Sequence, residues 1–272
     1  MHVRTIQVLA VFALSTAIAG LSQTAPTLNG GTAGQPKRPP APMLPFTAEF
    51  KTTVVQVLAN GATISTESTR TQARDGQGRY YDANTLMPRD GRPQVTSFHI
   101  SDPIAGTETR WDSQQKKATV YQLPPVDQRH GCWQSESDSS KWVYPLTPEQ
   151  RTAEKATELS PPAVMPTVSD HAVHEKLGTD VIQGLQVHGS RTTFTIPAGQ
   201  AGNDQPLVHT SEMWFSDEYR LQARWINDDP QQGKTMRELV GFTPGEPDPS
   251  LFQPPQGYEV VTEELHQVSC HS

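Results

Sequence analysis

Histidine is the residue type in this chain that most directly suggests chemistry, because the imidazole ring is the commonest metal ligand in proteins. Among the nine His, the densest cluster is formed by His171, His174 and Glu175. The order His-x-x-His-Glu differs from the zinc patterns His-Glu-x-x-His and His-x-x-Glu-His. It also falls where a loop meets a strand, not on a helix that would place both rings on one side. We expect a solvated polar turn here, with metal binding as the alternative, and we predict no metal or cofactor.

No motif for nucleophilic catalysis is found. The chain lacks the Gly-x-Ser-x-Gly and glycine-rich phosphate-binding patterns. Cys132 has His130 near it in sequence, but nothing identifies that imidazole as its general base. Carboxylates such as Glu212, Glu238 and Asp228 could meet across strands, as in a glycosidase pair, but no feature selects two of them. We predict no catalytic residue.

The five tryptophans are more informative. Trp214 and Trp225 lie in segments with strand character. If both face the same side as Leu221 and Leu239, a curved sheet would present an apolar surface for a lipid or acyl ligand. These four residues are the predicted ligand-binding residues, and an ordinary sheet core is the alternative.

The elements that would position these side chains are mostly strands, because apolar and polar residues alternate with a period of two. Residues 46–58 and 62–74 flank Asn60-Gly61, a strong hairpin signal. Thr147 and Pro148 suit the start of a helix over residues 147–159. The other predicted strands are 94–101, 107–112, 118–123, 180–187, 191–196, 208–215, 219–226 and 235–242. The pattern predicts a mainly β fold, a single curved antiparallel sheet or half-open barrel with one or two covering helices.

The N-terminal part has the features of a processed leader. Arg4 precedes a short apolar run, and Ala17 and Ala19 form an A-x-A pattern, so we expect a signal peptide over residues 1–19. Residues 20–45 are rich in Pro and Gly and predict a disordered linker. Residues 46–272 then form one β-rich domain. The mature chain is predicted to have no transmembrane segment and to be exported, either periplasmic or extracellular.

Two further features constrain partners and stability. The formal net charge is −7 and no basic run exists, so nucleic acid is excluded as a partner. The two cysteines, Cys132 and Cys270, fit one disulfide in an exported protein, with two unpaired thiols as the alternative.

The C-terminal half carries a resemblance. The stretches IPAG-x-x-GND, over residues 196–204, and EPDPSLFQ-P, over residues 246–254, resemble a family of uncharacterised exported proteins of soil bacteria. The closing LFQPPQGYEV is also similar, more distantly, to the periplasmic lipoprotein-carrier (LolA-like) fold. That likeness implies a curved antiparallel half-barrel with helices across its mouth. The soil-bacterial family implies no catalytic residues.

These observations favour a non-enzymatic exported protein that binds a hydrophobic ligand, such as a lipid or lipopeptide, or an envelope protein on a curved sheet. Two alternatives remain from the residues alone: a secreted hydrolase of envelope or extracellular polymers, and a structural or interaction module. No oligomeric state is predicted.

Overall fold

The computed structural model describes residues 43–86, 93–149 and 172–270. The predicted signal peptide, and the predicted linker up to residue 42, lie outside the described residues. The first strand begins at Phe46, the residue at which the sequence predicts the folded part to start. Within the described residues, no helix is long and apolar enough to cross a membrane.

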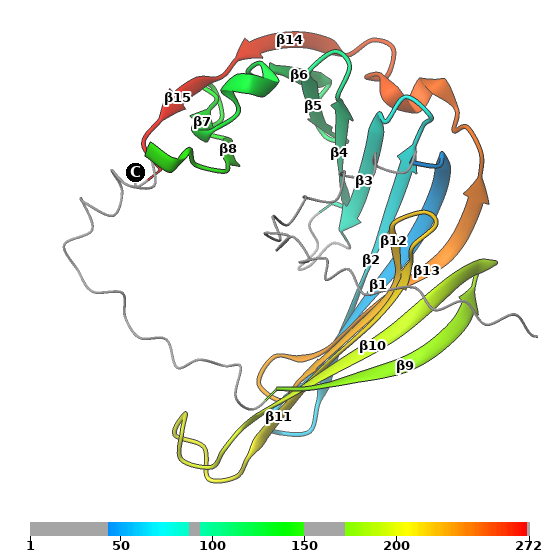
Figure 1. The fold of residues 1–272 in the computed structure, drawn as a ribbon, viewed down its shortest axis with the longest axis vertical. Coiled ribbons are helices and arrows are strands. Elements are labelled where there is room, and N and C mark those ends of the chain that lie inside the picture. The colour runs from blue at the N-terminus through cyan, green and yellow to red at the C-terminus, as the bar shows by residue number, and fades with distance from the viewer. Residues whose placement is uncertain (1–42, 87–92, 150–171, 271–272) are drawn as a thin grey trace, which may run out of the picture. The chain divides into compact units, whose positions relative to one another are not determined.

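A twelve-stranded, curved and unclosed sheet makes up most of the structure (Figure 1). Its order is β14-β6-β5-β4-β3-β2-β1-β13-β12-β11-β10-β9, and neighbours are antiparallel except β14 and β6. The strands are β1 (Phe46–Val57), β2 (Thr63–Arg74), β3 (Tyr80–Leu86), β4 (Val95–Asp102), β5 (Thr107–Asp112), β6 (Lys117–Gln122), β9 (Ala172–Ile182), β10 (Leu185–Ile196), β11 (Leu207–Ser216), β12 (Leu221–Asp229), β13 (Gly233–Pro244) and β14 (Glu259–Glu264). The predicted fold class is confirmed.

Helical structure is scarce in the described residues. It includes two short 3₁₀ turns, η1 (Val126–Gln128) and η3 (Pro249–Phe252). Of the helix predicted over residues 147–159, Pro148 and Glu149 are helical, and the remainder lies outside the described residues.

The predicted hairpin at Asn60-Gly61 is confirmed. Gly61 adopts a φ of 81°, which costs glycine little, and Asn60 Oδ1 accepts a hydrogen bond from the Ala62 N–H at 3.0 Å. β1 pairs on one side with β2, the next strand in the chain, and on the other with β13, far along the chain. That second pairing joins the two halves of the sheet.

Two strand predictions are wrong in their bounds. Residues 180–187 do not form one strand, because Gln183 and Gly184 have φ values of 50° and 81° and make the turn between β9 and β10. The strand predicted from Tyr219 begins at Leu221, since Arg220 has a φ of 53° and lies in a turn. In both places an alternating apolar pattern continues through a turn.

The two faces of the sheet bury different residues. We call the face that carries Phe50, Arg110 and Tyr121 the inner face, because Tyr121 and Arg110 contact strand β8, which lies inside the curve in Figure 1. The opposite, outer face of β2–β6 is covered by the segment around η3. Its buried residues are Ala73, Tyr81, Ala83, Ile100, Trp111 and Ala118, which pack with Phe252.

A second core lies at the β1, β12 and β13 region. Phe46, Ala48 and Phe50 point to the inner face from β1, and Leu239 is the cross-strand partner of Phe50. Phe46 and Phe50 are at most 2% exposed. The inner face is thus buried around β1, β12 and β13, and the outer face is buried over β2–β6.

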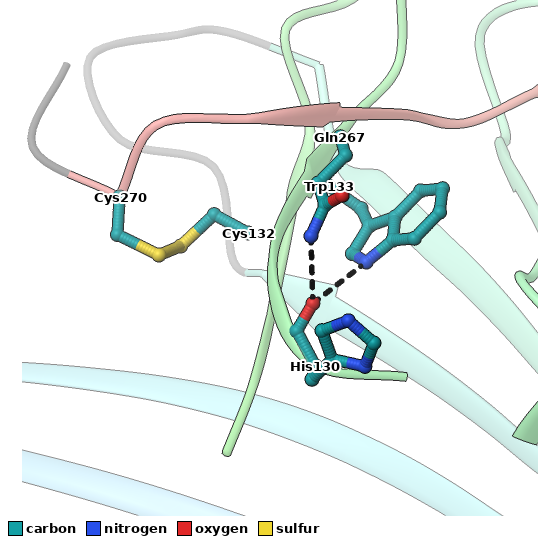
Figure 2. Close-up of a disulfide and its surroundings, with 5 residues drawn as sticks. All are labelled: His130, Cys132, Trp133, Gln267 and Cys270. Atoms are coloured by element: carbon teal, nitrogen blue, oxygen red, sulfur yellow. Dashed lines mark hydrogen bonds between the residues drawn. A yellow bond between two sulfur atoms is a disulfide. The ribbon is translucent and has the colours of Figure 1, made fainter. Parts of the chain in front are cut away.

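A three-stranded sheet, β15 (His266–Val268), β7 (Gly131–Gln134) and β8 (Lys141–Tyr144), packs against the inner face of β5 and β6. The Cys132–Cys270 disulfide joins it to the C-terminal segment, which confirms the predicted pairing (Figure 2). Figure 2 also shows the His130 carbonyl accepting hydrogen bonds from Trp133 Nε1 at 3.1 Å and Gln267 Nε2 at 3.3 Å.

Candidate ligand-binding face

The four residues predicted to bind a ligand lie in two different environments. Leu221 and Leu239 are 6% and 3% exposed and belong to the core, so their side chains are occupied by the protein itself. Trp214 and Trp225 are partly buried. Their cross-strand partners are Arg224 and Met213, and because paired residues share a face, the two indoles point to opposite faces.

Trp214 is engaged in packing within the sheet. Its indole lies so close over Gly189 that a Cβ atom there would come within 2.7 Å of the ring. Its Nε1 donates a hydrogen bond to Glu212 Oε1 at 2.7 Å. A glycine inside a strand indicates such a close approach, so Gly189 is the sequence signal that could have separated Trp214 from Trp225.

Trp225 belongs to a row of side chains that crosses the inner face. Its Nε1 donates a hydrogen bond to Ser211 Oγ at 3.1 Å, and the residue is partly buried. Two other apolar members of the row are exposed, Met213 by 38% and Leu86 by 57%. We call this set the Trp225 row; in cross-strand order it is Leu86, Ser68, Thr52, Arg237, Trp225 and Met213.

Arg237 is the charged member of this row. Its Nη2 donates a hydrogen bond to Gln222 Oε1, and its guanidinium lies 5.4 Å from the centroid of the Phe50 ring. Burial, together with the nearby charge of Arg70, lowers the pKa of Arg237 below its usual value.

The other end of the inner face, over β3–β6, is densely charged. Glu108 Oε2 accepts hydrogen bonds from Arg110 Nη2 at 2.8 Å and Trp142 Nε1 at 2.9 Å, and His99 Nε2 lies 3.3 Å away. Burial alone would raise the pKa of Glu108, but the interactions with His99, Trp142 and Arg110 outweigh it and lower the pKa to about 2.

A pocket of about 610 Å³ lies beside this carboxylate. Across it, the Tyr121 hydroxyl donates a hydrogen bond to Asp138, in the segment between β7 and β8. Burial and this bond raise the pKa of Tyr121 to about 12, so it stays protonated at neutral pH. The charged and polar lining comprises Asp82, Ser97, His99, Arg110, Asp112, Gln115, Lys117, Thr119, Tyr121, Ser137 and Asp138.

Six carboxyl groups in the described residues have a pKa below the ordinary value for their residue type. Glycoside hydrolysis needs one carboxyl group whose pKa is raised, so that it can donate a proton near neutral pH. The pKa is instead lowered in these six carboxyl groups, which are Glu108, Asp138, Glu149, Glu212, Asp248 and Glu263.

The scattered acids noted in the sequence each have a basic partner. Glu212 pairs with Arg191 at 2.8 Å and Glu238 with Arg224 at 3.0 Å. Lys234 lies 3.8 Å from Asp228. These three carboxylates are therefore each engaged with a basic side chain on the sheet.

The histidine cluster is only partly described. His174 lies in β9 with its Nδ1 3.0 Å from Thr192 Oγ1, and Glu175 is 3.4 Å from Arg191, while His171 lies outside the described residues. The part of the chain that the structure describes contains no group of three or more metal-ligating side chains.

Comparison with known proteins gives likenesses of fold. No family model and no curated protein matches the chain. A MucA/MucB complex of Pseudomonas aeruginosa is 11% identical, with a TM-score of 0.38, over 81% of this chain and 59% of that chain. An uncharacterized conserved protein from Thermus thermophilus is 9% identical, with a TM-score of 0.37, over 80% and 90% of the two chains. A putative outer membrane lipoprotein-sorting protein domain from Vibrio parahaemolyticus is 10% identical, with a TM-score of 0.26, over 74% and 85%. Likenesses at this level carry no assignment of function.

Proposed function

We propose that the chain is a non-catalytic, exported binding protein whose inner face holds a hydrophobic small molecule along the Trp225 row. The observation that carries the proposal is Trp225 itself: a partly exposed indole in the middle of a curved face, with exposed Met213 as its cross-strand partner. Aromatic and flexible thioether side chains are the usual lining of apolar ligand sites.

The surrounding chemistry supports binding without catalysis. The row also contains the neighbouring hydroxyl groups of Thr52 and Ser68, which can orient a ligand without reacting with it. The lowered pKa values of Glu108 and Glu212 disfavour these two carboxyl groups as general acids at neutral pH, which counts against the alternative of a hydrolase that uses them. The Cys132–Cys270 disulfide supports an oxidising compartment, as in the cell envelope or outside the cell.

The test is binding of the neutral apolar fluorophore N-phenyl-1-naphthylamine, whose emission rises when it enters an apolar site. Two matched variants locate the site on the sheet. Met213→Glu places a charge in the Trp225 row, and Val208→Glu places the same charge on the same strand but on the opposite face, where Val208 is 49% exposed.

We expect saturable binding of the fluorophore by the wild type. Met213→Glu should lower the affinity about tenfold or more, because a charge is poorly tolerated in an apolar contact. Val208→Glu should leave the affinity unchanged. Absence of saturable binding, or equal losses in both variants, would refute the proposal. A protein ligand instead of a small molecule would be indicated if the fluorophore does not bind but a purified envelope protein is retained and Met213→Glu releases it.

A further inference from the structure

Arg237 has a positive charge that the described residues do not neutralise. The chain has 29 acidic and 22 basic residues, so an unpaired cation is unexpected on its surface and more so where it is half-buried. Its one side-chain hydrogen bond within the described residues is to Gln222, a neutral amide, and no described carboxylate lies within 4.0 Å of it. Its Nε is buried without any hydrogen-bond partner.

Asp82, the carboxylate whose charge acts on Arg237, is already paired with another arginine. Asp82 Oδ2 lies 2.5 Å from Arg70 Nη2 and 2.7 Å from Arg70 Nε, and it also accepts from Gln72 Nε2 at 3.2 Å. Tyr80, which faces the same region, has a pKa raised to about 12, mainly by burial, and is therefore neutral near pH 7.

A further guanidinium on the same face adds positive charge. Arg74 is 7% exposed and donates only to neutral carbonyl oxygens among its described oxygen partners, those of Leu44 at 2.7 Å and Tyr219 at 2.9 Å. The inner face around Phe50 thus holds three guanidinium groups and one carboxylate. Of the three, Arg237 is the one that neither a carboxylate nor a backbone carbonyl satisfies.

The position of Arg237 relates this charge to the proposed ligand site. It lies directly between Thr52 and Trp225 in the Trp225 row. A charge that is partly removed from water is costly unless an opposite charge or hydrogen bonds compensate for it. An anion bound from solution would supply both, since the planar guanidinium can donate two parallel hydrogen bonds to a carboxylate or phosphate.

We propose that the ligand is an anionic single-chain amphiphile: a carboxylate or phosphate headgroup pairs with Arg237, and its apolar chain lies over Trp225 and Met213. This inference rests on the proposed function, because it assigns the ligand class of the same site. The headgroup chemistry is shared by fatty acids and alkyl phosphates, and the experiment separates them.

The experiment is competition against N-phenyl-1-naphthylamine with four ligands of the same twelve-carbon chain, each below its critical micelle concentration. They are dodecanoate, dodecyl phosphate, neutral glycerol monolaurate and cationic dodecyltrimethylammonium. For the wild type we expect one or both anionic ligands to compete at concentrations at least tenfold lower than the neutral and cationic ones. Which of the two anions competes better distinguishes a fatty acid from an alkyl phosphate. Acetate and inorganic phosphate, which lack the chain, should not compete at the same concentrations.

The variant Arg237→Met keeps most of the side-chain length and removes the charge. It should lose the preference for anions while still binding the fluorophore and glycerol monolaurate as the wild type does. The matched control is Arg224→Met, on the outer face, where the arginine pairs with Glu238 at 3.0 Å; it should retain the preference. If Arg237→Met does not fold, Arg237→Lys should keep a reduced preference for anions over the neutral ligand.

The failures of the two proposals are distinguishable. The anionic headgroup is overturned, and the binding site left intact, if anionic and neutral ligands compete equally for the wild type. The same holds if the preference for anions survives in Arg237→Met, or if it disappears in Arg224→Met alone. In Arg237→Lys, a preference for anions that is unchanged, or that is absent altogether, would also overturn the pairing of the headgroup with Arg237. If acetate or inorganic phosphate competes without an attached alkyl chain, the inference that the ligand is an amphiphile is wrong. If neither the fluorophore nor any twelve-carbon ligand binds, the proposed function itself fails.

Discussion

The two ends of the inner face use polar groups in opposite ways. Over β3–β6, the carboxylate of Glu108 accepts hydrogen bonds from Arg110 and Trp142 and has His99 Nε2 3.3 Å away, and the Tyr121 hydroxyl donates to Asp138. At the Trp225 row, Arg237 has one neutral partner and a buried Nε without any. The charged end is the more conspicuous, and its Glu108, Asp82 and Asp138 carboxylates all accept hydrogen bonds, although His99 Nε2 is buried without a hydrogen-bond partner, as Arg237 Nε is. The difference lies in the pairing of charge: Arg70 and Arg110 each contact a carboxylate, whereas Arg237 contacts only a neutral amide among the described residues.

The disulfide provides the largest expected effect, and it acts on the charged end. Cys132 and Cys270 are 138 residues apart, and closing a loop of that length removes unfolded-state entropy worth about 4–5 kcal/mol. We expect Cys132→Ser with Cys270→Ser, or reduction of the wild type, to lower the midpoint of thermal unfolding markedly. Circular dichroism with and without reductant measures it. Binding at the Trp225 row should persist below the new midpoint; its loss would mean that the two ends are not independent.

Glu108 tests whether the charged end stabilises the fold. Its pKa is lowered from 4.5 to about 2 in the folded chain, so it favours folding above its unfolded pKa, and this contribution disappears as the pH falls from about 4.5 to about 2. The whole contribution is on the order of 3 kcal/mol. Denaturant unfolding of the wild type and Glu108→Gln at several pH values should show a shallower pH dependence for the variant in that interval. Identical pH profiles would contradict a stabilising role.

Gly189 gives a smaller effect at the other end of the sheet. In Gly189→Ala, the new methyl group would lie about 2.7 Å from the Trp214 ring, so the indole must move. We expect a loss of about 1–3 kcal/mol of stability, which is typical of overpacking, and a shift in tryptophan emission. Because Trp214 and Trp225 point to opposite faces, affinity for N-phenyl-1-naphthylamine should change little. A large loss of affinity would show that Trp214 also contributes to the site.

The sequence predicts the fold class well because most strands have one wet face and alternate accordingly. The strand over residues 107–112 is predicted with the bounds it has in the structure, and β1 and β2 differ from their predictions only at the hairpin ends. The alternation fails at β3, which is not predicted. Its inner face carries Asp82, a poor strand former, which becomes favourable only because Arg70 on β2 pairs with it.

The candidate site is less accessible to sequence reasoning. An alternating pattern shows that Leu221 and Trp225 lie in a strand, but it does not show which parts of a face the rest of the chain covers. The structure buries Leu221 and Leu239 and leaves Trp225 partly exposed. No sequence pattern identifies Arg237 as a candidate. Its lack of a carboxylate partner depends on strands that are far apart in the chain, and on the ion pair that Asp82 forms with Arg70.

The pairing of β1 with β13 has a consequence for how the chain folds. β1–β6 and β9–β13 are each built from strands that neighbour one another in sequence, so each set can form through short loop closures. Joining them requires Phe46 to find Pro244, and the later pairing of β14 with β6 requires Glu259 to find Lys117. Such distant contacts are slow to form. We therefore expect biphasic refolding, with two hairpin arrays appearing first and their union, which aligns Thr52, Arg237 and Trp225, completing the site last.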